Sequence, residues 1–116
     1  MDAKQVFHTG GKRGDGNIVL YVVGELEATS APVLREALRG ALANGTALVV
    51  VDCSHLTFID TAGLGVLVWA ANQARGLGKT LELRNQSAAI DEVLRLTGIG
   101  GFFAVVDSRP PIALTA

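Results

Sequence analysis

The sequence predicts an α/β fold built on a mostly parallel, five-stranded mixed β-sheet flanked by three to four helices. Two observations carry this prediction. The run 47–51, Ala-Leu-Val-Val-Val, is apolar, rich in β-branched residues and too short for a helix, which is typical of a central strand buried on both faces. From residue 18 onward, strand and helix patterns alternate, which favours parallel strands joined by right-handed crossovers. We expect one domain spanning 1–116.

Each element is predicted from its periodicity and from the residues that bound it. Short apolar or alternating runs between turn residues indicate strands, and apolar positions three or four apart between an N-cap and a glycine indicate helices. These signals predict strands at 3–8, 18–23, 47–51, 80–84 and 102–106, and helices that start after Thr29 or Ser30, at Ala62 and after Ser87 and end near Asn44, Gly76 and Gly98. Pro110 and Pro111 either start a short fourth helix or belong to a loose tail over 107–116.

The stretch between the central strand and the next helix carries the densest group of functional side chains. The strand is expected to end at Asp52, and Asp60 or Thr61 is the natural N-cap of the following helix. In parallel sheets, functional groups gather beyond the carboxyl ends of the strands. The segments expected to meet at this edge are 24–29, 52–61 and 84–87.

Thr61 has two interpretations on position alone. As an N-cap, its hydroxyl would accept a hydrogen bond from a backbone N–H, which is worth about 1 kcal/mol. As a modification site it would be well placed, because the helix dipole and the first amides tolerate a phosphate of about −1.5 to −2 charge. Gly63 and Gly65 follow in the first turn, where each costs helix propensity of about 1 kcal/mol relative to Ala. That cost indicates that another backbone, or a partner, comes close.

The helix that begins at Ala62 carries two apolar faces on a helical wheel. The face expected to pack on the sheet consists of Leu64, Leu67, Val68 and Ala71. The opposite face consists of Ala62, Val66, Trp69 and Gln73. An outward Val66 and the only tryptophan, Trp69, form either a protein-binding patch or a second packing face under a neighbouring segment.

Composition excludes several classes of function. The net charge of −1 leaves no basic excess for nucleic acid or an anionic membrane, and no apolar run approaches the roughly 20 residues of a membrane span. Cys53 is the only cysteine, and it has only His8 and His55 to combine with, which falls short of a metal site. We expect a cytoplasmic protein that holds no metal and no cofactor and contacts neither nucleic acid nor membrane.

Enzyme motifs are incomplete. The stretch 76–80, Gly-Leu-Gly-Lys-Thr, resembles the end of a phosphate-binding loop, but Gln73 stands where the leading glycine belongs. The stretch also follows a helix and precedes a strand, which reverses the order that such a loop needs. Gly63-Leu64-Gly65 lacks the rest of a dinucleotide fingerprint. No catalytic constellation emerges, and the chain is not expected to be an enzyme.

The residues of the junction resemble a known signature. The run 52–65, D-C-S-H-L-T-F-I-D-T-A-G-L-G, is similar to the pattern D-x-S-x-x-x-F-[IM]-D-[ST]-x-G-L-G of STAS domains, specifically the anti-sigma factor antagonists. Upstream, the run 24–27, G-E-L-E, resembles that family's G-E-L-D, and the order of elements matches over essentially the whole chain. The resemblance implies a single STAS domain over 1–116.

In that family, the unphosphorylated domain binds an anti-sigma factor that is also a serine/threonine kinase, and so frees a sigma factor. The resemblance implies that the ATP-dependent kinase phosphorylates Thr61, which ends binding, and that a phosphatase restores it. It also implies that Glu27 and Asp60 lie near the kinase surface. With the residues around the helix start and the outward face of the helix, the predicted partner-binding surface consists of Glu27, Ser54, Asp60, Thr61, Ala62, Gly63, Gly65, Val66 and Trp69. The family more often has Ser at the position of Thr61 and Asp at that of Glu27. We expect a monomer or a weak homodimer.

Two other functions stay open at this point. The chain is alternatively a STAS scaffold or small-ligand-binding subunit of a larger assembly, for example a transport or signalling system, that is never phosphorylated. Thr61 would then be only a helix cap. A third hypothesis is an enzyme that uses the loop edge as a nucleotide site.

Overall fold

The computed structural model describes residues 7–9, 17–44, 46–99 and 104–106. In chain order, the elements in these ranges are β1 (Phe7–Thr9), β2 (Asn17–Leu26), α1 (Ala31–Ala43), β3 (Leu48–Ile59), α2 (Thr61–Gly76), β4 (Thr80–Arg84), α3 (Ala88–Thr97) and β5 (Ala104–Val106). The predicted α/β class and the alternation of strand and helix are confirmed. The fourth helix expected at Pro110-Pro111 and the tail 107–116 lie outside the described residues.

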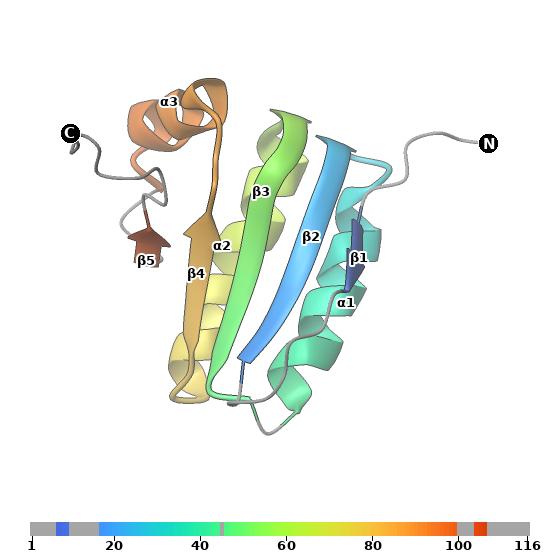
Figure 1. Ribbon diagram of the computed structural model, residues 1–116, viewed down its shortest axis with the longest axis vertical. Coiled ribbons are helices and arrows are strands. Elements are labelled where there is room, and N and C mark those ends of the chain that lie inside the picture. The colour runs from blue at the N-terminus through green and yellow to red at the C-terminus, as the bar shows by residue number, and fades with distance from the viewer. Residues whose placement is uncertain (1–6, 10–16, 45, 100–103, 107–116) are drawn as a thin grey trace, which may run out of the picture.

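The strands form one sheet in the order β1-β2-β3-β4-β5 (Figure 1). Its main part is the parallel trio β2, β3 and β4, and short β5 continues it in parallel at one edge. Short β1 pairs antiparallel with β2 at the other edge, as expected for a strand added by a hairpin. The sheet is therefore mixed and mostly parallel.

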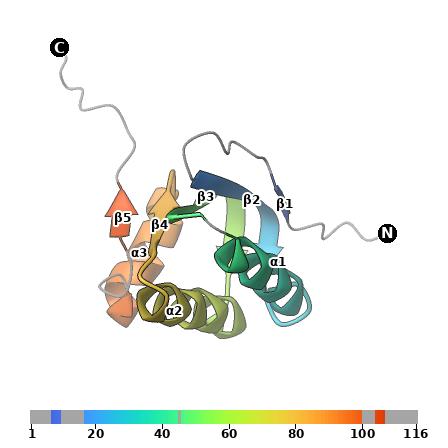
Figure 2. The same ribbon diagram turned by 90° about the horizontal axis from the view of Figure 1, so that it is seen from below.

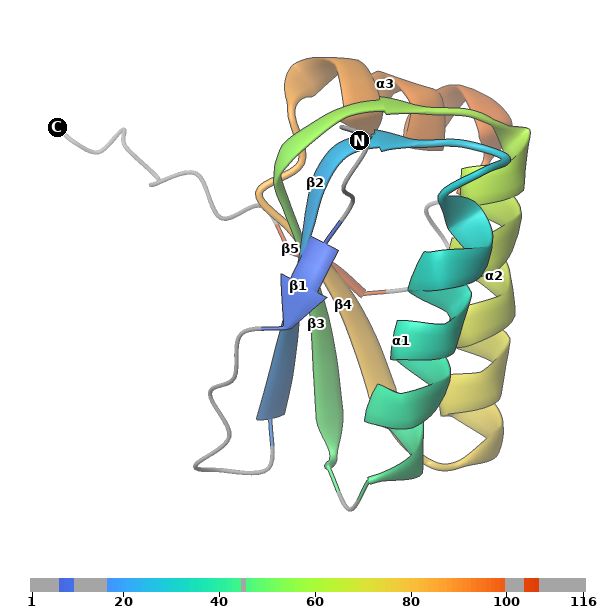
Figure 3. The ribbon, with the colours of Figure 1, turned by 90° about the vertical axis from the view of Figure 1, so that its right-hand side faces the viewer.

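The helices divide between two positions (Figures 2 and 3). Helices α1 and α2 lie side by side on one face of the sheet, while α3 lies near the ends of β3 and β4. The core between the sheet and these helices consists of alternate strand residues and of helix leucines, among them Leu20, Val22, Val49, Val51, Leu81, Leu83, Leu34, Leu38 and Leu67. The alternation follows from the two-residue period of a strand, which sends every second side chain to the same face.

Strands β2 and β3 are longer than the sequence predicted. The expected ends at Val23 and Asp52 are wrong, because the two strands stay paired as far as Leu26 and Ile59. Pairing of β3 with β4 does stop at Asp52, so beyond that residue β2 and β3 continue as a two-stranded ribbon. Two register shifts each add one residue on β3, and such bulges let a polar stretch that reads as a loop remain in a strand.

Helix α2 is buried on two sides. The prediction that Val66 points outward is wrong: only 6% of its surface is exposed, and it belongs to the same core as Leu67. The reason is that α2 packs against α1 as well as the sheet. Trp69 is half-buried and also packs on the core, with the guanidinium groups of Arg35 and Arg39 at 4.3 and 5.3 Å from its ring centre. The second packing face is thus the correct interpretation of this side of α2.

The bounds of α3 agree with the sequence signals. The Ser87 hydroxyl accepts a hydrogen bond from the Ile90 amide at 3.2 Å, and Gly98 ends the helix in the left-handed conformation. Ile90 and Leu94 are buried, and Val93 is half-buried. Within the described ranges, no helix has both the length and the apolarity to cross a bilayer.

The thiol of Cys53 is expected to be unreactive in the folded protein. Burial raises its pKa to about 12, with a contribution from the charge of Asp52, so almost no thiolate exists at neutral pH. Ellman's reagent should label the native protein at least 100-fold more slowly than the urea-unfolded protein, and the labelling rate should rise with the unfolded fraction. Native labelling within about tenfold of the unfolded rate would contradict the burial of this side chain.

Candidate functional site

The ends of β2 and β3 meet the start of α2 at one edge of the sheet. Leu26 and Ile59 are the last paired residues of the two strands, and the Asp60 amide donates a hydrogen bond to the Leu26 carbonyl at 3.1 Å. Glu27 and Asp60 therefore follow directly from paired residues. The expected convergence of these two segments is confirmed.

Asp60 is the N-cap of α2. Its carboxylate accepts a hydrogen bond from the Gly63 amide at 3.0 Å, and its carbonyl accepts one from the Leu64 amide at 2.9 Å. Thr61 is the first residue of the helix and is exposed, and its hydroxyl makes no hydrogen bond to any described residue. The N-cap interpretation of Thr61 is therefore wrong, because the carboxylate of Asp60 already takes the capping position.

The two glycines of the first turn have different surroundings. A Cβ on Gly63 would lie 2.8 Å from Cγ of Leu26, 2.9 Å from Cγ1 of Ile59 and 2.9 Å from the Leu26 carbonyl oxygen. Gly63 is thus needed for the helix to approach the strand ends. A Cβ on Gly65 would meet nothing within 4 Å, and this residue is exposed. Nothing inside the described fold explains the glycine at 65.

The segment after β2 is held by hydrogen bonds around Ser30. The Ser30 hydroxyl donates to the Glu25 carbonyl at 2.8 Å and accepts from the Glu27 amide at 3.0 Å. The Glu27 carbonyl in turn accepts from the Ala31 amide at 2.7 Å, which begins α1. Glu27 is half-buried in this turn, so its backbone position next to the α2 junction is fixed.

A second polar cluster lies where β3 separates from β4. The Asp52 carboxylate accepts hydrogen bonds from the Ser54 hydroxyl at 2.6 Å, the Ser54 amide at 2.9 Å and the Asn85 side-chain amide at 2.9 Å. The Ser54 hydroxyl also lies 3.2 Å from Nδ1 of His55. Burial by itself would raise the pKa of Asp52, but these hydrogen bonds and the nearby charge of His55 hold it below its usual value.

The nine residues predicted to bind a partner differ in accessibility. Ser54, Thr61 and Gly65 are exposed; Glu27, Asp60, Ala62 and Trp69 are half-buried; Gly63 and Val66 are buried. Buried Val66 and Gly63 serve the fold, and Ser54 belongs to the Asp52 cluster. The accessible part of the predicted surface is therefore centred on the first turn of α2.

Phe58 is a surface residue that the sequence analysis missed. Half of its surface is exposed, in contrast to its buried neighbours Leu56 and Ile59. Opposite Gly24 and Glu25, β3 carries one extra residue, so its buried residues Leu56 and Ile59 are three apart and the intervening Phe58 is exposed. Two consecutive apolar residues, Phe58 and Ile59, before the helix cap were the available signal, because adjacent strand residues point to opposite faces.

The side chains at this edge are engaged mainly in hydrogen bonds that hold the local structure. Within the described ranges, no group of three or more His, Cys, Asp or Glu side chains is arranged to hold a metal ion. The Asp52 cluster saturates its carboxylate with hydrogen bonds, and its Ser54 hydroxyl already donates to that carboxylate.

Comparison with known proteins identifies the family. The sequence pattern of the family described as "Mlab, STAS domain" matches residues 11–107. An anti-sigma-B factor antagonist of Bacillus subtilis is 31% identical over 96 residues, which cover 83% of this chain and 84% of that relative. The chain belongs to the STAS family of anti-sigma factor antagonists.

Solved structures agree with this placement of the STAS domain. An anti-sigma factor antagonist from Mycobacterium paratuberculosis is 26% identical and matches with a TM-score of 0.74, covering 99% of this chain and 97% of that one. The antagonist SpoIIAA, solved in unphosphorylated and phosphorylated forms, matches with TM-scores of 0.70 and 0.69 at 18% and 19% identity. Those matches cover 92% of this chain and 93% and 95% of SpoIIAA, and they support the fold.

The two glycines of α2 are expected to respond oppositely to alanine. Gly63→Ala should lower the free energy of unfolding by about 1–3 kcal/mol, because its Cβ would overlap the strand ends. Gly65→Ala should raise it by about 0.5–1 kcal/mol, since alanine loses less conformational freedom in a helix. Urea unfolding of both variants provides the comparison, and equal effects of the same sign would contradict the described approach of α2 to β2 and β3.

Replacing Ser54 with Ala should lower the free energy of unfolding at pH 7 by about 0.5–1 kcal/mol, because the Asp52 carboxylate loses a donor. The lowered pKa of Asp52 in the folded state means that the ionised carboxylate stabilises the fold above its unfolded pKa of about 4. This contribution is lost as the pH falls through the lower, folded pKa. The difference between wild type and Ser54→Ala should therefore shrink as the pH is lowered from 7 to below the unfolded pKa of about 4.

Urea unfolding at both ends of this pH range measures the effect, and Asp52→Asn supplies the matched background. In that background the cost of Ser54→Ala should not depend on pH. If Ser54→Ala lowers the free energy of unfolding by the same amount at every pH in the wild-type background, the hydrogen bond to the Asp52 carboxylate is not the cause of the loss.

Proposed function

We propose that this chain is a phosphorylation-controlled partner switch. The unphosphorylated domain binds an anti-sigma factor that is also a serine/threonine kinase, and phosphorylation of Thr61 ends that binding. The observation that carries the proposal is the exposed Thr61 hydroxyl at the first position of α2, with Asp60 rather than Thr61 in the capping role. The hydroxyl can therefore be modified without loss of the cap.

A phosphate on Thr61 is compatible with the fold. The amides and the dipole at the start of α2 favour negative charge there, so the modified protein should keep its structure. SpoIIAA, which shares this fold, has been solved in both unphosphorylated and phosphorylated forms. These two SpoIIAA structures are consistent with a switch in which phosphorylation changes the surface charge and leaves the fold intact.

The same phosphate would be unfavourable in a complex. It would place about −1.5 to −2 charge beside the Asp60 carboxylate, at the edge that also carries Glu27. A partner docked there would have to desolvate these charges, and every 1.4 kcal/mol of lost interaction weakens binding tenfold. Release then follows from charge alone, and a phosphatase that removes the group restores the binding form.

The surface around Thr61 has features suited to a partner. Phe58 offers a half-exposed aromatic ring, and aromatic residues are enriched at the centres of interfaces. Gly65, one turn after Thr61, has no described neighbour within 4 Å of where its Cβ would lie, and it would let a partner backbone come close. We propose that Phe58, Thr61, Ala62 and Gly65, with Asp60 and Glu27 at the rim, form the kinase-binding surface.

The test uses charge-matched substitutions at Thr61 as baits in lysate of the source cell, with bound proteins identified by mass spectrometry. Wild type, Thr61→Ala and Thr61→Asn should recover the same ATP-binding kinase, because none of them carries charge at residue 61. Thr61→Asp should lose it. Asparagine has nearly the same shape as aspartate but no charge, so a difference in kinase recovery between Thr61→Asn and Thr61→Asp reports the effect of the charge alone.

The recovered kinase then provides the second measurement. Incubation with ATP should add one phosphate to wild type by intact-mass analysis and none to Thr61→Ala. If all four baits recover the same partners, or if Thr61→Ala is still phosphorylated, the switch at Thr61 is refuted.

A further inference from the structure

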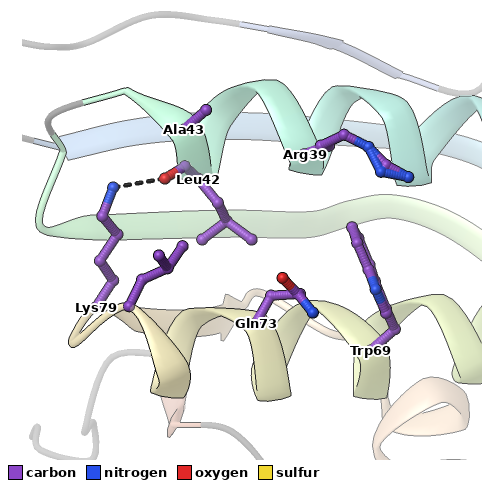
Figure 4. Close-up of a pocket in the computed structure, with 7 residues that line it drawn as sticks. Arg39, Leu42, Ala43, Trp69, Gln73 and Lys79 are labelled. Atoms are coloured by element: carbon purple, nitrogen blue, oxygen red, sulfur yellow. Dashed lines mark hydrogen bonds between the residues drawn. The ribbon is translucent and has the colours of Figure 1, made fainter.

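A groove separates the C-terminal halves of α1 and α2, at the opposite end of α2 from Thr61 (Figure 4). Helix α1 contributes Arg39, Leu42 and Ala43 to the lining, and α2 contributes Trp69 and Gln73, with its C-cap residue Leu77 directly after them. Lys79, which follows α2, completes the wall. The volume of about 410 Å³ is within the range of about 300–1,000 Å³ that is usual for small-molecule pockets.

The lining combines apolar surface with positive charge. Leu42 contributes a buried apolar side chain, and Leu77 contributes one that is 55% exposed. The charged residues of the lining, Arg39 and Lys79, are both cations, although the whole chain has a net charge of −1. The groove is therefore complementary to a molecule that is both apolar and anionic.

The two cations have different tasks. The Lys79 ammonium donates hydrogen bonds to the carbonyls of Leu42 at 2.5 Å (Figure 4) and of Asn44 at 2.6 Å, so it compensates the partial negative charge at the C-terminal end of α1. Arg39 lies over Trp69 and pairs at 3.4 Å with Glu36, a solvent-exposed contact of small energetic value. The Arg39 guanidinium keeps donors available for a ligand, since it carries five N–H groups.

From this lining we infer that the groove binds a small organic anion, a carboxylate carried on an apolar chain. The carboxylate would accept hydrogen bonds from Arg39 and from the Gln73 amide, and the chain would lie against Leu42 and Leu77. An apolar body with one or two fixed polar contacts is the usual composition of a small-ligand site. This site is distinct from the Thr61 surface and does not depend on the proposed switch.

Octanoate is the probe, and octanol is its neutral counterpart of equal chain length. The only tryptophan, Trp69, lines the groove, so its fluorescence reports binding directly. Octanoate should cause a saturable change, with an affinity at least about tenfold higher than that of octanol, because charge-assisted hydrogen bonds are lost in the alcohol. Amide shift mapping should place the effect on the C-terminal halves of α1 and α2.

The residues to be substituted, Arg39, Gln73 and Arg95, are exposed, so the fold should tolerate the substitutions. Gln73→Glu is nearly isosteric and brings a negative charge into the groove, and it should weaken octanoate binding at least about tenfold. Arg39→Met removes the guanidinium and should weaken binding to a similar degree. Arg95→Met is the matched control, because Arg95 forms the same exposed i,i+3 pair with Glu92 but lies on α3.

Four results would overturn the inference. They are the absence of saturable octanoate binding, equal affinity for octanol, unchanged affinity in Gln73→Glu, and a loss of affinity in Arg95→Met as large as that in Arg39→Met. Far-UV circular dichroism of each variant confirms that a loss of binding is not a loss of fold.

Discussion

The structure depends on the close approach of the first turn of α2 to the paired ends of β2 and β3. The Asp60 amide donates to the Leu26 carbonyl, and Gly63 stands where any Cβ would overlap Leu26 and Ile59. This contact fixes where the helix begins and the direction in which its N-terminus points. The position of Thr61 at the surface is a consequence, because the capping role falls to Asp60.

Burial of α2 on two sides determines what its remaining surface can do. The sheet covers one face of the helix and α1 covers another, which places Val66 in the core and Trp69 under Arg35. The exposed residues of α2 lie in its first turns and near its C-terminus: Thr61, Gly65, Asn72, Gln73, Arg75 and Gly76. The two sites that we propose lie at opposite ends of this helix: the surface around Thr61 at its N-terminus and the groove lined by Trp69 and Gln73 near its C-terminus.

The two proposed sites use opposite electrostatics. At the N-terminal end, carboxylates stand beside a hydroxyl, so an added phosphate would increase an existing negative charge and oppose binding. At the C-terminal end, Arg39 and Lys79 line an apolar hollow, where a negative ligand would be attracted. Because the sites lie at opposite ends of a helix of 16 residues, about 24 Å long, variants at one should leave the other unchanged.

The α/β class, the alternation of elements, the caps of α3, the junction at Asp60 and Thr61, and the family could all be predicted from the sequence. These rest on local periodicity, on capping chemistry and on a contiguous motif, all of which are readable along one chain. Tertiary structure alone decided the extension of β3 to Ile59, the exposure of Phe58 and the burial of Val66. Strand pairing with bulges sets the first two, and packing against α1 sets the third. Such facts depend on what lies beside a residue in space, which neighbours in the sequence do not specify.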